Sequence, residues 1–155
     1  MVYNEASMSF DENPGYLLQH TITLLSKQSD QILQERLGIG LSQYKILMVL
    51  QETPSVKQRH IAERLGQTEA SISRQIRLMH EDGLLQTIKR PDNRRENITT
   101  LTHRGDQISD EATTLLRQYQ APIFGALSNR QQRQLTDVLD LIHEQICQGN
   151  RTGRC

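Results

Sequence analysis

The feature that most constrains the fold is a pair of short helical segments separated by a glycine. Counting Gln58 as the first position, a small residue (Ala62) stands at the fifth, Gly66 at the ninth and an apolar residue (Ile72) at the fifteenth. Crossing helices need a small residue where they touch, and glycine best tolerates the positive φ of a tight turn. An apolar side chain at the later position anchors the second helix. This spacing predicts a helix-turn-helix over residues 56–82.

A charged hairpin is predicted directly after this motif. Residues 84–89 and 97–101 are rich in Leu, Ile and Thr, which favour strands, and Arg90, Arg94 and Arg95 lie between them. A turn that only protects an edge strand from aggregation needs one or two charges of either sign. Three arginines within six residues therefore favour a wing that enters the minor groove of DNA, where the negative potential attracts arginine.

Long amphipathic helices are predicted on both sides of this region. Apolar residues recur at helical spacing from Tyr16 to the Gly38-Ile39-Gly40 break, and again after Thr102 and after Ser128, which have the side chains of helix caps. The helix that follows Thr102 is expected to be disturbed at Pro122. The apolar stripe of the last helix is expected to face inward, and it consists of Leu135, Val138, Leu139, Ile142 and Ile146.

Two further caps are predicted for the shorter helices. Ser42 is expected to cap the second helix, and residues 55–58 have the form of a capping box that opens the third. Together these elements predict a mainly α protein with a small β-hairpin wing (α+β), in the order ααααββαα.

The formal net charge of zero hides an uneven distribution. Residues 57–96 carry nine basic and six acidic side chains, residues 1–56 carry three basic and six acidic, and residues 97–155 carry six of each. The positive excess therefore coincides with the predicted helix-turn-helix and wing. Such an asymmetry is expected when one segment meets phosphate and the others meet something else.

The second helix of the motif presents a face that suits the major groove. At about 100° per residue, Ile72, Ile76 and Met79 point inward, and the opposite side carries arginines and small side chains. The arginines can reach guanine or phosphate, and the threonine can hold a phosphate at the helix N-terminus. The alternative is a solvated polar face without a partner. We predict DNA contacts from Thr68, Ala70, Ser71, Ser73, Arg74 and Arg77.

Several protein classes are excluded by the sequence. Nothing approaches the ~18 consecutive apolar residues of a membrane span, and no basic region followed by an apolar stretch predicts a secretory signal. Cys147 and Cys155 are too few for a disulfide framework. We therefore expect a cytoplasmic protein.

Metal binding and catalysis have little support. His143 and Cys147 have the i, i+4 spacing that can hold a metal on one helix face, but His103, Asp106 and Asp110 would have to supply the other ligands. Ordinary packing explains the pair, so we expect neither a metal nor a cofactor. Ser, His and Asp are scattered over helices without a Gly-rich loop or a nucleophile turn, which predicts that the protein is not an enzyme.

Short motifs follow one another in a specific order along the chain. They are Leu41-Ser42-Gln43-Tyr44, His60-Ile61-Ala62-Glu63-Arg64-Leu65-Gly66, Ser71-Ile72-Ser73-Arg74, Gly83-Leu84-Leu85, Asn93-Arg94-Arg95 and Leu101-Thr102-x-x-Gly105. Their order and spacing resemble the MarR family of winged-helix transcription regulators, and the resemblance extends from Tyr16 to the last helix.

The wing departs from the family pattern at one position. The residue that is usually the wing aspartate falls on Asn93, and the minor-groove arginine falls on Arg95. Asp92 can serve instead by pairing with Arg94 or Arg95, so both arginines remain candidates for the groove. We predict wing contacts to DNA from Arg90, Asp92, Asn93, Arg94 and Arg95.

The resemblance implies a homodimer whose first, fifth and sixth helices interlock. The apolar content of 35% agrees with this, because it lies below the roughly 45–50% (Gly included) of a typical soluble domain, and a thin core gains from a second copy. Two-fold symmetry would place the recognition helices about one DNA turn, roughly 34 Å, apart on a pseudo-palindromic double-stranded operator.

The resemblance also implies a small-molecule effector, often an aromatic acid, bound between the dimer helices and the winged domain. Tyr16, His20 and Tyr44 are the candidate pocket residues. Packing of Tyr44 in the core and of His20 in the dimer interface is the simpler interpretation.

These inferences give a division of the chain. We predict a flexible arm over residues 1–14, a dimerisation helix over residues 15–40, a winged helix-turn-helix domain over residues 41–101 with the wing at 84–101, two dimerisation helices over residues 102–148, and a tail over residues 149–155.

The expected function is that of a homodimeric, sequence-specific DNA-binding transcriptional regulator, a repressor, whose affinity responds to a phenolic or aromatic-acid effector. One alternative is a winged-helix protein-interaction module without DNA readout, but such modules commonly lose the basic helix face and the wing arginines. The other is a thiol-based redox-sensing regulator that uses Cys147 or Cys155, although the N-terminal region contains no cysteine.

Overall fold

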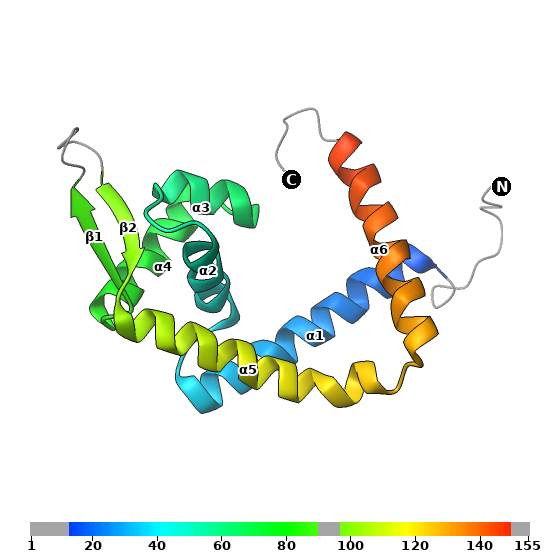
Figure 1. Cartoon of the computed structure of the whole chain (residues 1–155). Helices are drawn as coiled ribbons and strands as arrows, with labels where there is room; N and C mark the ends of the chain where they lie inside the picture. The colour runs from blue at the N-terminus through cyan, green and yellow to red at the C-terminus, as the bar shows by residue number, and fades with distance from the viewer. Residues whose placement is uncertain (1–12, 90–96, 150–155) are drawn as a thin grey trace. The chain divides into compact units, whose positions relative to one another are not determined.

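The computed structural model describes residues 13–89 and 97–149 (Figure 1). The chain divides into two compact units, residues 1–41 and residues 42–155. The fold is mainly helical with a two-stranded antiparallel hairpin, as predicted. Among the described helices, none is both long and apolar enough to cross a membrane. The elements are α1 (Pro14–Leu37), α2 (Leu41–Glu52), α3 (Gln58–Leu65), α4 (Glu69–Glu81), β1 (Leu85–Lys89), β2 (Asn97–Leu101), α5 (His103–Gly125) and α6 (Asn129–Gly149).

Helix α1 starts inside the range that was predicted for the arm. Asn13 is its N-cap, and its Oδ1 accepts hydrogen bonds from the N–H groups of Gly15 (2.9 Å) and Tyr16 (3.1 Å). Pro14 takes the first helical position, where its fixed φ suits the helix and its missing N–H costs no hydrogen bond. The rest of the predicted arm, residues 1–12, lies outside the described residues.

The turn between α1 and α2 differs from the prediction at its second half. Gly38, with φ of 68°, ends α1 as expected, and its N–H binds the carbonyl oxygen of Gln34. Ser42 does not cap α2, because the helix already begins at Leu41. The Leu41 N–H instead donates to Oδ1 of Asp30 at 2.7 Å. A carboxylate distant in sequence thus satisfies one of the free N–H groups at this helix start.

The helix-turn-helix forms as the spacing predicts. Gly66 ends α3 with φ of 61°, and its N–H binds the carbonyl oxygens of Ala62 and Glu63. Ile72, Ile76 and Met79 are no more than 3% exposed, so the predicted inner stripe of α4 is confirmed. Burial of such side chains is the main force that holds the helices together. The largest apolar side chains buried in the second unit are Ile46, Leu47, Leu50, Ile61, Ile72, Met79 and Leu85.

The predicted capping box at the start of α3 is wrong. Lys57 is the N-cap residue, and its side chain makes no capping hydrogen bond. Ser55 has φ of 66°, and Val56 forms an antiparallel bridge with Thr99 through its carbonyl oxygen (3.0 Å). The backbone before α3 therefore pairs with the hairpin, which prevents the serine from taking the extended capping conformation.

The hairpin has the predicted strands in antiparallel register. Leu85 pairs with Leu101 and Ile88 pairs with Ile98. The first strand begins one residue later than predicted, because the Leu84 N–H still binds the Met79 carbonyl oxygen (2.8 Å) at the end of α4.

The start of α5 lies close to the backbone that precedes β1. Thr102 caps α5 as predicted, since its Oγ1 accepts the N–H of Gly105 at 3.0 Å. The same hydroxyl donates to the carbonyl oxygens of Gly83 (2.7 Å) and Leu84 (3.1 Å). Gly105 is buried, and a Cβ at this position would overlap the Leu84 carbonyl oxygen. A glycine is therefore required for α5 to lie this close to the hairpin.

A polar cluster joins α2 to α5. The Gln51 Nε2 donates to Oδ1 of Asp106 (3.0 Å) and of Asp110 (2.9 Å). Its Oε1 accepts a hydrogen bond from the Ser109 hydroxyl at 2.7 Å. Ser109 is fully buried, so Gln51 supplies the acceptor that its hydroxyl requires.

Helix α5 extends past Pro122 to Gly125, so the proline does not end the helix. Because proline has no N–H, it removes the helical hydrogen bond to the carbonyl oxygen of Gln118. Gln118 is an exposed residue, so water can replace the lost donor. The predicted capping box at the start of α6 is confirmed, because Gln131 Oε1 accepts the Ser128 N–H (2.9 Å) and the Gln131 N–H donates to Ser128 Oγ (3.3 Å).

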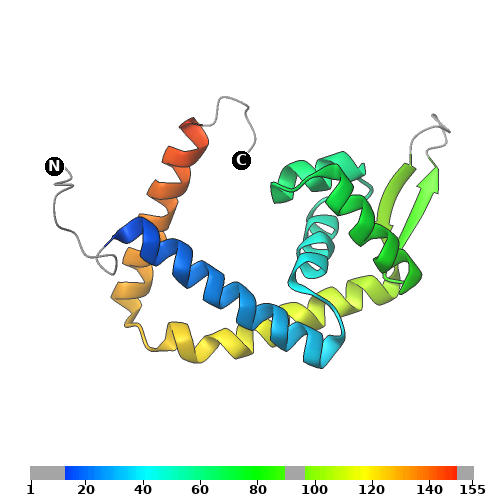
Figure 2. The same ribbon diagram turned by 180° about the vertical axis from the view of Figure 1, so that it is seen from behind.

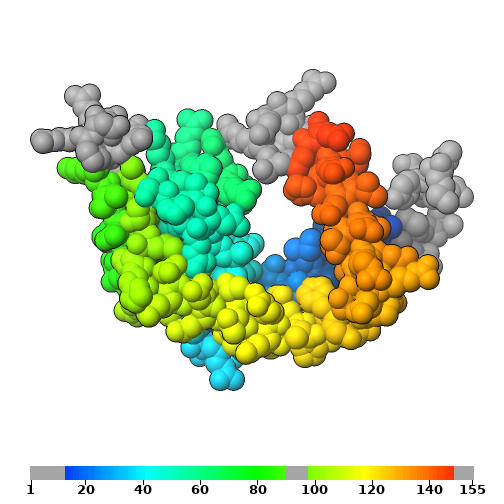
Figure 3. All heavy atoms as spheres, viewed as in Figure 1, coloured from blue at the N-terminus to red at the C-terminus, as the bar shows by residue number. Residues whose placement is uncertain are grey.

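The apolar stripe of α6, the helix drawn in orange and red in Figure 3, is exposed within the single chain. Leu139 is 39% exposed and Ile146 is 64% exposed, and Leu135, Val138 and Ile142 are also classed among the exposed side chains. Periodicity identifies an apolar face but not the surface that covers it. The prediction that these side chains are buried is therefore wrong for one chain alone.

Replacement of Gly105 by alanine tests the close approach of α5. Gly105→Ala should lower the free energy of unfolding by about 1–3 kcal/mol, because the added methyl group forces α5 away from the Leu84 carbonyl. Gly125→Ala is the control: its Cβ meets no atom within 4 Å, so it should be neutral or stabilise by up to about 1 kcal/mol. Urea unfolding measures both, and equal effects would contradict the assigned contact.

The Gln51 cluster predicts a second stability difference. Gln51→Ala should cost about 1–3 kcal/mol, because the buried Ser109 hydroxyl loses its acceptor. Gln107→Ala removes an exposed glutamine from the same region of α5 and should change stability by less than about 0.5 kcal/mol. A thermal or urea midpoint for each variant checks this, and a Gln51 variant as stable as the control would show that the cluster contributes nothing.

Candidate nucleic-acid interface

Helix α4 lies at the outside of the second unit, next to the hairpin (Figure 2). Its start is held by Thr68, whose Oγ1 accepts the Ser71 N–H at 3.2 Å. The hydroxyl hydrogen of Thr68 is not used in this bond and can still be donated to a phosphate oxygen. The cap and the predicted phosphate contact are thus compatible.

The side of α4 opposite the core carries most of the predicted recognition residues. Ala70, Ser73, Arg74 and Arg77 are exposed. Ser71 is half-buried, and its hydroxyl lies 3.5 Å from Gln67 Oε1, so it is turned from this face. Ala70, Ser73, Arg74 and Arg77 have i, i+3, i+4 and i+7 spacing and therefore share one face of α4. A helix that lies along a groove contacts it through such a face.

Arginines on α3 and α4 differ in their partners. Arg59 Nε binds Glu63 Oε1 at 2.9 Å, and Arg64 Nη2 binds Glu52 Oε2 at 3.0 Å. The hydrogen bond that Arg59 donates to the Glu63 carboxylate is the main cause that raises the pKa of Arg59. Within the described part of the chain, Arg74 and Arg77 make neither an ion pair nor a hydrogen bond. Among the described residues, the unpaired guanidinium groups of the two helices are therefore those of Arg74 and Arg77 on α4.

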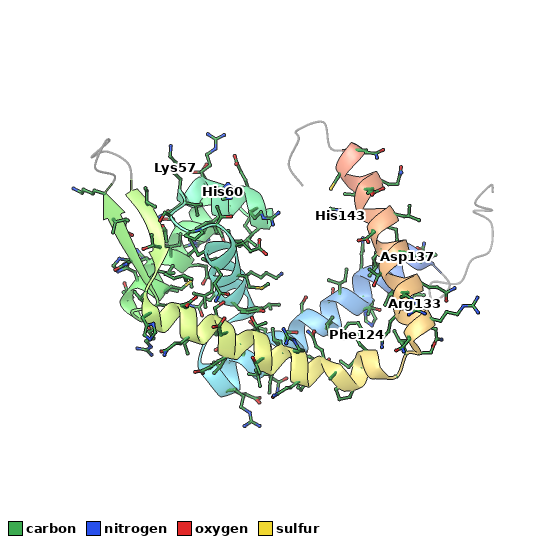
Figure 4. The ribbon with its side chains drawn as sticks, in the orientation of Figure 1. Lys57, His60, Phe124, Arg133, Asp137 and His143 are labelled. Carbon is green, nitrogen blue, oxygen red and sulfur yellow. The ribbon has the colours of Figure 1, made fainter. Side chains whose placement is uncertain are left out.

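Two further basic residues lie at the start of α3 and were not selected from the sequence. Lys57 and His60 are exposed there (Figure 4). In the sequence, only the positive excess of residues 57–96 pointed to these two residues. That excess does not identify which basic side chains of the segment are exposed.

The predicted wing residues cannot be placed. Arg90, Asp92, Asn93, Arg94 and Arg95 all lie outside the described residues. The strands that lead to them, β1 and β2, end at Lys89 and begin at Asn97.

The predicted effector residues fall in both units. In the first unit, the rings of Tyr16 and His20 stack with centroids 5.5 Å apart and planes 13° from parallel. In the second unit, Tyr44 is buried, and its hydroxyl lies 2.9 Å from Thr113 Oγ1. Tyr44 thus packs in the core, which agrees with the simpler interpretation of this residue.

The histidine and cysteine of α6 lie close together on one helix face. Cys147 Sγ is 3.6 Å from Nε2 of His143. Among the residues that the structure describes, no group of three His, Cys, Asp or Glu side chains is arranged to hold a metal ion. Cys155 lies outside this part of the chain.

Comparison with known proteins relates this arrangement to one family. Residues 37–96, which contain α2, the helix-turn-helix and the first strand, match the model of the MarR family. The HTH-type transcriptional regulator BilQ of Clostridium symbiosum is 22% identical over 102 residues, which cover 66% of this chain and 71% of that protein.

Solved structures share the fold over most of the chain. CouR from Rhodococcus jostii, bound to p-coumaroyl-CoA, superposes with a TM-score of 0.75 at 22% identity and covers 88% of this chain and 95% of its own. PcaV of Streptomyces coelicolor, in complex with its natural ligand, gives a TM-score of 0.70 at 21% identity and covers 90% and 97%. BilQ and PcaV are both named as transcriptional regulators, the class of protein that the sequence predicted for this chain.

Proposed function

We propose that this chain, which belongs to the MarR family by its winged helix-turn-helix, is a homodimeric repressor that binds a pseudo-palindromic operator in double-stranded DNA. A dimer that occupies an operator excludes other proteins from the DNA it covers. Because the proposed partner is DNA, the proposed location is the cytoplasm.

The observation that carries the proposal is the charge distribution over α3 and α4. The arginines of α3 are paired with carboxylates, whereas Arg74 and Arg77 project from α4 without partners among the described residues. An α-helix fits the major groove, which is about 12 Å wide. Arginine makes its strongest base contact there, a bidentate hydrogen bond to guanine O6 and N7, and phosphate is its other partner.

The wing adds a second contact in the proposal. Arg90, Arg94 and Arg95 follow β1 directly, and β1 contacts α4. A basic tip at this place suits the minor groove beside the major-groove segment that α4 would occupy. Either Arg94 or Arg95 is proposed to enter the groove, with Asp92 or Asn93 as its neighbour.

The exposed apolar side chains of α5 and α6 support the proposed dimer. Beside the α6 stripe, Tyr119, Ile123 and Phe124 near the end of α5 are 39–46% exposed. Contiguous apolar surface of this kind usually marks a protein interface. A second copy that packs there would complete the core that the low apolar content of the chain leaves thin.

A small-molecule effector is proposed from two of the structural neighbours. CouR is bound to p-coumaroyl-CoA and PcaV to its natural ligand. For this chain we propose a phenolic or aromatic acid that favours one spacing of the two recognition helices, since a ligand shifts an equilibrium only by its differential affinity for the two states. The stacked rings of Tyr16 and His20 offer an aromatic surface for it.

DNA binding is tested by titration against the upstream DNA of the protein's own gene and against random DNA. Arg74→Ala and Arg77→Ala should each weaken binding to the preferred sequence by about 1–3 kcal/mol, because a bidentate base contact is lost. Arg117→Ala, an exposed arginine of α5, is the charge-matched control and should bind as the wild type does. Equal losses on both DNAs would reduce the two arginines to phosphate contacts, and no preference by the wild type would contradict the proposal.

The dimer is tested with two leucines of α6. Leu139→Asp places a charge on the apolar stripe and should convert the dimer to a monomer. Leu141→Asp is the control, because two residues along a helix point to nearly opposite sides and Leu141, 61% exposed, lies off the stripe. Sedimentation or light scattering measures the mass; a monomeric wild type, or a dimer that survives Leu139→Asp, would contradict the proposed interface.

A further inference from the structure

We infer that Glu69 is a specificity-determining residue that accepts a hydrogen bond from the N4 amino group of a cytosine in the major groove. This inference rests on the proposed DNA binding and deepens it, since it names the base that one position of the operator should carry. The DNA contacts predicted for α4 and its cap include no acidic residue, so Glu69 was not among them.

The position of Glu69 in the fold is the first argument. Glu69 is the first residue of α4, directly after the Thr68 cap, and it is exposed. Recognition helices insert their N-terminal residues most deeply toward the base edges. A side chain at the first helical position is therefore among those nearest to the bases when α4 lies in the groove.

The second argument is that the carboxylate of Glu69 makes no hydrogen bond or ion pair within the described residues, 13–89 and 97–149. Arg59 is close enough for Glu69 to raise its pKa, but the guanidinium is held by Glu63 at 2.9 Å. The exposed carboxylate of Glu69 can therefore accept a hydrogen bond from a donor in the DNA.

The chemistry of the groove then selects the donor. A carboxylate repels the phosphates that Arg74, Arg77 and the wing would attract, so it gains energy in a complex only where a base offers an N–H group. In the major groove these groups are cytosine N4 and adenine N6. Adenine also presents its N7 acceptor beside the amino group, which repels a carboxylate, whereas cytosine does not. Cytosine is therefore the matching base.

A carboxylate in the first turn of a helix also interacts favourably with the helix dipole. That contribution stabilises the helix whichever DNA sequence is bound. A change in base preference therefore distinguishes a base contact by Glu69 from a purely structural role. The experiment is a selection of bound sequences from a random duplex pool by wild-type protein, Glu69→Ala, Glu69→Gln and Glu81→Gln. Glu81 is the matched control because it is an exposed glutamate at the other end of α4.

We expect the wild type and Glu81→Gln to select a cytosine at one position of each half-site. Glu69→Ala should lose that preference and keep the others, with discrimination against a substituted base falling roughly tenfold. Glu69→Gln should change the preference toward adenine, with which glutamine pairs at N6 and N7. Both Glu69 variants should bind random DNA more tightly, because a negative charge is removed from the interface.

The outcomes distinguish this inference from the function on which it rests. If the wild type enriches a sequence and Glu69→Ala enriches the same one at every position, the assignment of Glu69 is wrong and the DNA-binding proposal stands. If the wild type enriches no sequence, the DNA-binding proposal fails and the assignment fails with it. Thermal unfolding of each variant controls for a loss of folding.

Discussion

The arrangement of the winged helix depends on the contact between the start of α5 and the turn that follows α4. The Thr102 hydroxyl caps α5 and also binds the carbonyl oxygen of Gly83, while Gly105 lets the helix backbone reach Leu84. The Thr102 side chain and the absence of a Cβ at Gly105 thus allow α5 to pack directly against the turn that leads into the hairpin. Gln51 adds a second junction, because its amide binds three side chains of α5 from the end of α2. The first two turns of α5 are thus joined both to the turn after α4 and to the end of α2.

A net charge of zero is compatible with DNA binding because of how the arginines are partnered. On α3, Arg59 and Arg64 are neutralised by carboxylates of their own unit. Arg74 and Arg77 on α4 are not, among the residues described. Exposed ion pairs contribute little to stability, so the pairs on α3 matter more for where the positive potential lies than for folding. The helix proposed to enter the major groove, α4, is the one whose arginines are unpaired among the described residues.

The sequence predicts the parts of this structure that depend on local interactions. The buried stripe of α4 follows from periodicity, and the caps at Thr102 and Ser128 follow from residues three positions apart. The failures depend on partners distant in sequence. Ser42 is not a cap because Asp30 binds the helix start, and Ser55 is not one because the next residue pairs with β2. In the candidate site, the outward face of α4 was predictable, but the pairing of the α3 arginines was not, since one partner lies on another helix.

The exposed stripe of α6 and the junctions at the start of α5 together suggest how an effector could act on DNA. In the proposed dimer, the α6 interface would lie beyond the far end of α5, whose 23 residues span about 34 Å at 1.5 Å per residue. Because the junctions around Gly105 and Gln51 hold the winged helix to α5, a change of helix angle at the interface would displace α4 as a rigid body. A ligand then needs no contact with α4 to alter DNA affinity: it needs only to bind one dimer spacing more tightly than the other. Operator DNA, which fits one spacing of the two recognition helices, must by the same coupling change the affinity for the ligand.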